Sequence, residues 1–278
     1  MKKIIEKQRE YLTMIKECYD LKSRMALLIS FFQVPLRYFY KLTGFKFKHK
    51  FIFNVTLKNK NGIFFCGKER GYARITCTFF ERNLQRYFKL DKGVFIDIGA
   101  NCGKYTIGIA RELGDLGNVI AIEPERKNFK FLLKNIRLNN LKNVYPMKLA
   151  CLDRSSELKL YLSDPDNDVG GHSINAFCES ENLGPNETYF DGRFENVKGE
   201  KLDVLFDNLG IGKGVSLIKI DVEGAEIEVL RGSVKILKRF HPKIIIETCE
   251  SHLRNIKKIL APYNYKIVQI SGDYYFAE

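Results

Sequence analysis

Short apolar segments alternate with longer amphipathic segments from residue 94 to the end of the chain. The apolar segments predict buried β-strands, and the amphipathic segments predict helices that cover a sheet. The predicted strands are 94–98, 118–123, 144–150, 215–221, 243–248, 264–270 and 273–277. The predicted helices are 103–113, 125–138, 226–239 and 250–261. This alternation indicates an α/β fold with a mostly parallel sheet, into which the last strand enters antiparallel after a short turn at Gly272.

The first 90 residues follow a different pattern. Apolar positions at helical spacing predict a helix within residues 1–23, and residues 24–53 are dense in aromatic side chains interleaved with Lys and Arg. Asn61-Gly62 is typical of a hairpin turn between two strands. We therefore expect an N-terminal cap of helix and hairpin over residues 1–90, followed by a catalytic domain over residues 91–278.

One polar segment interrupts the strand–helix alternation. Residues 163–200 are rich in Asp, Asn, Gly and Glu, and they lie between two regions of regular apolar periodicity. A segment of this length and composition is typical of an inserted hairpin or lid.

The positive charge of the chain is concentrated at its N-terminus. The formal net charge is +13, and residues 1–60 carry 14 Lys or Arg against 4 Asp or Glu. Three interpretations remain open for this segment: a helical cap packed on the catalytic domain, an interfacial helix on an anionic membrane, or a nucleic-acid contact. The apolar run 25–32 is too short to cross a membrane, and no signal peptide is evident.

Cysteine usage points to a reducing compartment. The chain has seven cysteines, which are scattered and form no C-x-x-C pair. We therefore expect neither a disulfide framework nor a cysteine-based zinc site. We expect a cytoplasmic location, where thiols stay reduced. Cys102 lies within a glycine-rich loop, but no neighbouring His would activate it, so we interpret it as a filler residue.

The segment Val94–Thr106, VFIDIGANCGKYT, predicts a ligand site at a strand end. Gly99 and Gly103 follow a buried strand and open a helix, whose first amides attract anionic groups. Glu123 ends the next strand, where a carboxylate can accept the hydroxyls of a ribose. The glycine spacing differs from the G-x-G-x-x-G of nicotinamide dinucleotide sites. It favours a nucleoside with an amino-acid tail, such as S-adenosylmethionine.

A second strand end is rich in carboxylates. Ser216–Glu226 reads SLIKIDVEGAE, so that Asp221, Glu223 and Glu226 cluster where a buried strand meets a helix. Acidic residues in the first turn of a helix also stabilise its dipole, which accounts for Glu226 and part of Glu223. Asp221 needs another explanation, and a ligand is the simplest one.

Four blocks of the sequence together resemble the FkbM family of S-adenosylmethionine-dependent methyltransferases. They are VFIDIGANCGKYT, VIAIEPERKNFKFLLKNIRLNN, SLIKIDVEGAEIEVLRG and PKIIIETCE, and they span residues 93–250 in the order typical of that family. The resemblance implies a class I methyltransferase fold, with a Rossmann-like seven-stranded sheet and a reversed last strand. It also implies methyl transfer to hydroxyl groups of sugars, glycolipids or related metabolites.

The resemblance assigns the cofactor-binding residues. Asp97, Gly99, Asn101, Gly103 and Thr106 would surround the methionine end of the cofactor. Glu123 would hold its ribose, and the turn that ends at Asp153 would border the adenine. Cys102 departs from the small or aliphatic residue that the family usually has at this position.

A hydroxyl acceptor requires a general base within hydrogen-bond reach. The candidate catalytic residues are Asp221, Glu223 and Glu247 at strand ends, and His172 in the predicted lid. The acids could instead hold Mg²⁺, but no dedicated set of ligands is evident, and we predict no metal site. The alternatives to a small-molecule or glycan O-methyltransferase are an RNA methyltransferase that uses the basic N-terminus, and a membrane-associated scaffold without activity.

Overall fold

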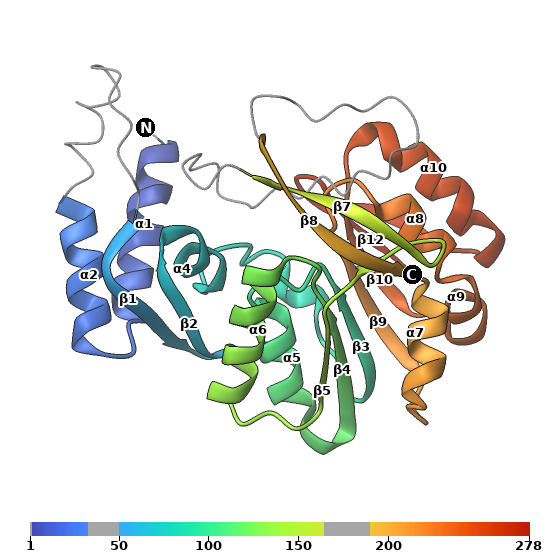
Figure 1. The fold of residues 1–278 in the computed structure, drawn as a ribbon, viewed down its shortest axis with the longest axis horizontal. Coiled ribbons are helices and arrows are strands. Elements are labelled where there is room, and N and C mark those ends of the chain that lie inside the picture. The colour runs from blue at the N-terminus through green and yellow to red at the C-terminus, as the bar shows by residue number, and fades with distance from the viewer. Residues whose placement is uncertain (1, 33–49, 164–189) are drawn as a thin grey trace.

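The computed structural model describes residues 2–32, 50–163 and 190–278, and its centre is a seven-stranded sheet with the order β11-β12-β10-β9-β3-β4-β5 (Figure 1). The strands are β3 Gly93–Ile98, β4 Gly117–Ile122, β5 Val144–Met147, β9 Val215–Ile220, β10 Lys243–Glu247, β11 Ile267–Ser271 and β12 Tyr274–Ala277. β12 is antiparallel to β10 and β11, whereas the other neighbouring strands are parallel. The predicted α/β fold with a reversed last strand is confirmed.

Helices cover both faces of this sheet, which explains the almost continuous apolar character of its strands. Within β3, Ile96 packs in one core with residues of α7, α8, α9 and α10, whereas Phe95 packs in a second core with residues of α5. The helices are α5 Lys104–Leu113, α6 Arg126–Leu138, α7 Leu202–Leu209, α8 Glu226–Arg231, α9 Val234–Phe240 and α10 Glu250–Leu260.

Three predicted element boundaries were wrong. The predicted helix 226–239 is two helices, because the backbone leaves the helix in a turn at Gly232 and Ser233 between α8 and α9. The predicted strand 144–150 ends early, and its last residue belongs to β6 Ala150–Cys151, which pairs with another sheet. The predicted strand 264–270 begins only at Ile267 because Asn264 has a left-handed backbone, with φ of 61°.

A second sheet lies beside the carboxyl ends of the main strands. β7 Ser156–Ser163 and β8 Phe190–Glu200 form an antiparallel pair, and β8 also pairs with β6. These strands flank or overlap the predicted lid 163–200, of which residues 164–189 lie outside the described residues. The apolar face of this sheet packs against Ala225, directly before α8.

The N-terminal elements form the opposite side of the molecule from α7, α9 and α10 (Figure 1). They are α1 Lys2–Lys16, α2 Leu21–Phe32, β1 Lys50–Asn59, β2 Gly62–Glu69, α4 Arg70–Thr76 and the short 3₁₀ helix η1 Gln85–Tyr87. β1 and β2 form the predicted hairpin. Their core is continuous with that of α5 and α6, because Phe64 and Tyr72 belong to one buried cluster with Ile107 and Leu132. Among the described helices, none has the length and apolar character needed to cross a bilayer.

Candidate active site

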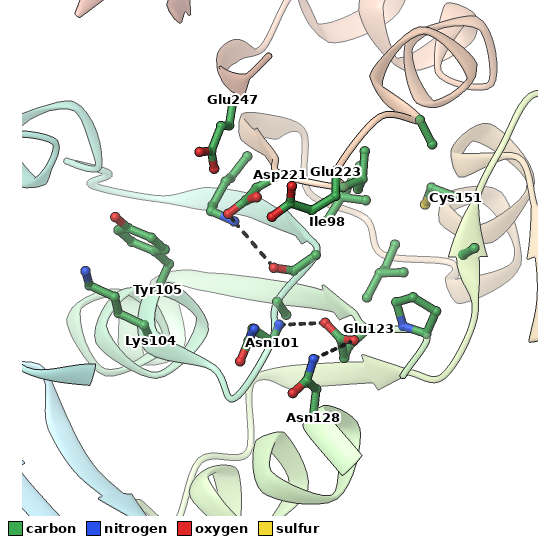
Figure 2. Close-up of a pocket in the computed structure, with 18 of the residues that line it drawn as sticks. Ile98, Asn101, Lys104, Tyr105, Glu123, Asn128, Cys151, Asp221, Glu223 and Glu247 are labelled. Carbon is green, nitrogen blue, oxygen red and sulfur yellow. Dashed lines mark hydrogen bonds and ion pairs between the residues drawn. The ribbon is translucent and has the colours of Figure 1, made fainter. Parts of the chain in front are cut away.

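A pocket lies at the carboxyl edge of the main sheet, where β3, β4, β9 and β10 end (Figure 2). The loop after β3 forms its floor. Gly99, Asn101 and Gly103 all have positive φ, at 78°, 51° and 93°, which turns the chain sharply from the strand into α5. The side-chain oxygen of Asn101 accepts the N–H of Cys102 at 2.7 Å, a local bond that favours this left-handed conformation.

Glu123 is the buried carboxylate of the pocket. Its Oε2 accepts the backbone N–H of Asn101 at 2.7 Å. Its Oε1 accepts the backbone N–H of Glu125 at 3.0 Å and the side-chain amide of Asn128 at 3.3 Å. Burial raises the pKa of Glu123 to about 8, although these donors oppose that shift. Since each carboxylate oxygen has two lone pairs, Oε2 has capacity for a ligand hydroxyl.

A buried ion pair supports the wall behind the pocket. Asp97 Oδ2 accepts the N–H of Thr106 at 3.1 Å and its hydroxyl at 2.6 Å. Asp97 Oδ1 has no hydrogen-bond partner and lies 3.7 Å from Nζ of Lys219. That ammonium also donates to Asp221 Oδ2 at 2.9 Å. Burial disfavours its charge, but the two carboxylates outweigh burial and hold the pKa of Lys219 above its usual value.

Asp221, Glu223 and Glu247 gather on one side of the pocket (Figure 2). Burial and the neighbouring Asp221 carboxylate raise the pKa of Glu247 to about 9. The same two causes raise the pKa of Glu223 to about 7. Near neutral pH, Glu247 is therefore a protonated donor beside the carboxylate of Asp221, an arrangement that can both donate to and accept from a hydroxyl group.

Glu226 has a different role from these three acids. Its Oε1 accepts the N–H of Gly224 at 2.6 Å, and its Oε2 lies 3.0 Å from Nδ1 of His252. It therefore stabilises the beginning of α8, as the sequence predicted.

A polar network that no sequence pattern indicated forms another part of the wall. Glu81, with φ of 52°, accepts the hydroxyl of Tyr105 at 2.5 Å and that of Tyr274 at 2.9 Å. It also accepts from Nζ of Lys104, at 3.2 Å. These residues come from the loop before η1, from α5 and from β12, so no local sequence pattern could have joined them.

Two other missed residues did carry a signal in the sequence. Lys219 is the one charged residue within the apolar strand VSLIKI, and a buried lysine requires charged partners. Asn128 is a polar residue on the buried face of α6. Both line the pocket.

The structure divides the predicted site residues into groups. Gly99, Asn101, Glu123, Asp221, Glu223 and Glu247 line the pocket. Asp97, Gly103 and Thr106 lie behind its wall, where Thr106 fixes Asp97. Asp153 does not line the pocket and pairs with Arg154 at 3.1 Å, although the preceding Ala150 and Cys151 do line it. His172 lies outside the described residues.

Cys102 is a packing residue, because it is fully buried in the core shared with Ile107 and Leu132 and does not line the pocket. Within residues 2–32, 50–163 and 190–278, no three His, Cys, Asp or Glu side chains are arranged to hold a metal ion.

Several known proteins are similar to this chain. A curated fungal protein, Methyltransferase 1 of Beauveria bassiana, is 26% identical over 166 residues, which cover 58% of this chain and 66% of the relative. Among solved structures, the FkbM methyltransferase of Methylobacillus flagellatus is similar with a TM-score of 0.46 and 17% identity, covering 99% of this chain and 59% of that one. TYW2 of M. jannaschii, solved in complex with AdoMet, has a TM-score of 0.41 and 15% identity, covering 81% and 83%.

The family model described as the methyltransferase FkbM domain matches residues 97–269, which is more than half of the chain. The match begins in β3 and ends in β11, so it includes the glycine loop, the acidic cluster and the carboxyl ends of β3, β4, β9 and β10. The chain belongs to the FkbM methyltransferase family.

Proposed function

We propose that this protein is an S-adenosylmethionine-dependent O-methyltransferase that methylates a hydroxyl group of a sugar, a glycolipid or a related metabolite. The observation that carries this proposal is the position of Asp221 beside Glu247, in the same pocket as the Glu123 carboxylate. One part of the pocket has the groups that a nucleoside needs, and the other has the groups that activate a hydroxyl.

The residues of the pocket suit the proposed cofactor. Glu123 is a buried carboxylate with a lone pair available for the ribose hydroxyls, and Leu149, Ala150 and Cys151 offer an apolar surface for the adenine. The positive φ of Gly99 and Asn101 turns the loop so that both residues line the pocket. When bound, S-adenosylmethionine supplies a methyl group activated by a sulfonium.

The chain itself supplies alignment and proton transfer. A hydroxyl is a weak nucleophile while protonated, so a base must accept its proton as the methyl group is transferred. Asp221, held by Lys219 at 2.9 Å, accepts that proton in our proposal. Glu247, whose raised pKa favours the protonated form, hydrogen-bonds Asp221 beside the acceptor, and Glu223 is the second candidate base. His172 remains a further candidate from the predicted lid.

The charge of the pocket favours an acceptor that is not anionic. Lys219 is already paired with Asp97 and Asp221, and Lys104 is paired with Glu81. The pocket therefore offers an entering phosphate no unpaired cation among the described residues that line it, and like charges repel. This supports a neutral hydroxyl compound over an RNA phosphate backbone as the group that enters the pocket.

The N-terminal segment supports a peripheral contact with an anionic membrane. Leu21, Met25 and Leu28 are spaced to lie on one face of α2, and they are 70%, 46% and 38% exposed. Exposed Lys22 and Arg24 flank this apolar stripe, as is typical of helices that lie on lipid surfaces. We also propose a cytoplasmic location, because the described cysteines are all free thiols and five of them are buried.

Vesicle co-sedimentation of the full chain tests the membrane contact. Vesicles that contain phosphatidylserine should retain the protein, whereas neutral phosphatidylcholine vesicles should not. The double change Leu21→Ser and Met25→Ser should release it. The matched control is Val268→Ser, because Val268 is similarly exposed, at 53%, but lies on β11.

Transfer of a labelled methyl group tests the enzymatic proposal. The protein is incubated with methyl-labelled S-adenosylmethionine and with neutral glycans, glycolipids, phosphorylated glycans and RNA. Label in a neutral glycan or glycolipid that survives mild alkali indicates a methyl ether and supports the proposal. Label confined to RNA would establish the alternative function, and alkali-labile label would indicate methyl ester formation instead.

A further inference from the structure

The N-terminal elements reach the candidate cofactor site through a chain of buried side chains. The hydroxyl of Tyr72, in α4, donates to Asn128 Oδ1 at 2.7 Å. Nδ2 of Asn128, in α6, donates to Glu123 Oε1 at 3.3 Å. All three residues are buried, so water cannot readily replace either bond.

The direction of the two hydrogen bonds from Tyr72 to Asn128 and from Asn128 to Glu123 shows how Tyr72 acts on the amide of Asn128. An amide has one acceptor side and one donor side, and its orientation is set by its hydrogen-bond partners. The ionised carboxylate of Glu123 can only accept, so the NH₂ group of Asn128 faces it, and the phenol of Tyr72 stabilises that orientation by donating to Oδ1. The reversed amide would place its oxygen against that carboxylate, where the two acceptors repel.

The Tyr72 ring is held independently of its hydroxyl group. It packs on Phe131 of α6 with ring centroids 4.5 Å apart, and Nζ of Lys127 lies 5.6 Å from its centre. The hydroxyl can therefore be removed without removing the packing of the ring.

A second contact from the N-terminal elements reaches the glycine loop. The side-chain oxygen of Asn135 accepts the backbone N–H of Phe65, in β2, at 2.7 Å. Its Nδ2 donates to the carbonyl oxygen of Cys102 at 2.8 Å. Asn135 follows Asn128 by two turns of α6, so the same face of this helix links α4 to Glu123 and the β1–β2 hairpin to the glycine loop.

We propose that Tyr72 is a positioning residue for the ribose of the cofactor, acting through Asn128 on Glu123. The segment before β3 is then a working part of the nucleoside site, beyond its role as a cap. This inference rests on the proposed function, because it assumes that Glu123 binds a ribose.

Isothermal titration of the full-length chain tests this inference with two nucleosides. The probes are S-adenosylhomocysteine and 5′-methylthioadenosine, which share ribose and adenine but differ in the amino-acid end. Above pH 8, where Glu123 is ionised, Tyr72→Phe should weaken both by roughly tenfold, since a hydrogen bond that supports a charged group is lost. The double variant Tyr72→Phe/Glu123→Gln should bind both nucleosides as tightly as Glu123→Gln alone, because both changes act on one interaction.

The matched control is Tyr11→Phe. Tyr11 is also buried in the N-terminal core, and its hydroxyl is 2.7 Å from Ser30 Oγ, but it does not contact the pocket. This variant should match Tyr72→Phe in thermal stability and bind both nucleosides like the unaltered chain.

Each other outcome overturns the inference. Tyr72 does not act through Glu123 if Tyr72→Phe leaves the affinity unchanged, or if Tyr72→Phe and Tyr11→Phe lose affinity equally. The same conclusion follows if the losses of affinity in Tyr72→Phe and Glu123→Gln add up in the double variant. Binding of S-adenosylhomocysteine by the unaltered chain would leave the proposed cofactor standing in those cases. If the unaltered chain bound neither nucleoside, the cofactor assignment would be wrong and the inference would fall with it.

Discussion

Gly99 and Asp221 belong to neighbouring strand ends that touch through their backbones. A Cβ on Gly99 would lie 1.8 Å from the carbonyl oxygen of Asp221, and the N–H of Asp221 donates to Ile98 O at 3.1 Å. The loop that forms the floor of the pocket and the loop that carries the candidate base are therefore in direct backbone contact. No residue with a side chain fits at position 99 without moving one of them.

The first prediction concerns this contact. Gly99→Ala should destabilise the fold by at least about 3 kcal/mol, because it adds a backbone clash to an unfavourable φ. The control is Gly210→Ala, where φ is also positive, at 58°, but no atom lies within 4 Å of the added Cβ. Gly210→Ala should lower the free energy of unfolding by only about 1 kcal/mol. Urea unfolding of both variants measures the difference, and equal losses would mean that the close approach is unimportant.

The second prediction concerns the buried ion pair behind the pocket. Lys219→Met leaves Asp97 as a buried, unpaired carboxylate, so it should cost about 3 to 5 kcal/mol of unfolding free energy. The matched control is Lys235→Met, which breaks the exposed pair with Asp207 at 3.5 Å and should cost less than about 0.5 kcal/mol. Chemical denaturation is the measurement. A loss at Lys219 as small as that at Lys235 would show that Asp97 does not need its partner.

The third prediction concerns the pH dependence of nucleoside binding. Burial raises the pKa of Glu123 to about 8, so this group is protonated below that pH and ionised above it. If the ionised form accepts the ribose hydroxyls, affinity should fall by up to about tenfold for each pH unit below 8. Titration with 5′-methylthioadenosine is suitable, because this nucleoside lacks the amino-acid end and its ionisable groups.

Glu123→Gln provides the control for that measurement. It cannot ionise, so its weaker affinity should be nearly independent of pH across the same range. A pH dependence that survives in Glu123→Gln would assign the titration to another group, such as Glu125, whose pKa burial raises to about 7.

The fourth prediction separates the roles of two acids. Asp221→Asn removes the proposed base and should lower kcat by about 10²- to 10⁴-fold. Glu247→Gln keeps a neutral hydrogen-bond donor where the raised pKa already keeps the carboxyl protonated, so kcat should fall by less than about fivefold. Single-turnover methyl transfer to the acceptor found by the labelling screen measures both. The opposite ranking would assign the base role to Glu247.

Much of the fold was predictable because the strands lie between two helical layers. Segments such as Val94–Ile98 are buried on both faces, and this leaves a clear apolar signal. The reversal of β12 followed from the short turn at Gly272. The break between α8 and α9 was missed, and the close approach of Gly232 to Leu152 could not be predicted because the two residues are distant in sequence.

Residues of the candidate site were predictable only where they lie at the end of a buried strand. Glu123 and Asp221 directly follow a buried strand and Glu247 ends one, so these acids could be identified from the sequence. Glu81 lies in a loop with no such signal, and it contacts Tyr274 across 193 positions of the chain. Asp97 lies near the end of β3, as predicted. It is buried with Thr106 and does not line the pocket, so it supports the pocket wall from behind.

The most direct test of the account is isothermal titration of the full chain with S-adenosylmethionine and S-adenosylhomocysteine. The pocket described above predicts saturable one-to-one binding of both in the micromolar range, weakened at least about tenfold by Glu123→Ala. A folded protein that binds neither compound, or that binds both unchanged after Glu123→Ala, would contradict the assignment of this pocket to the cofactor.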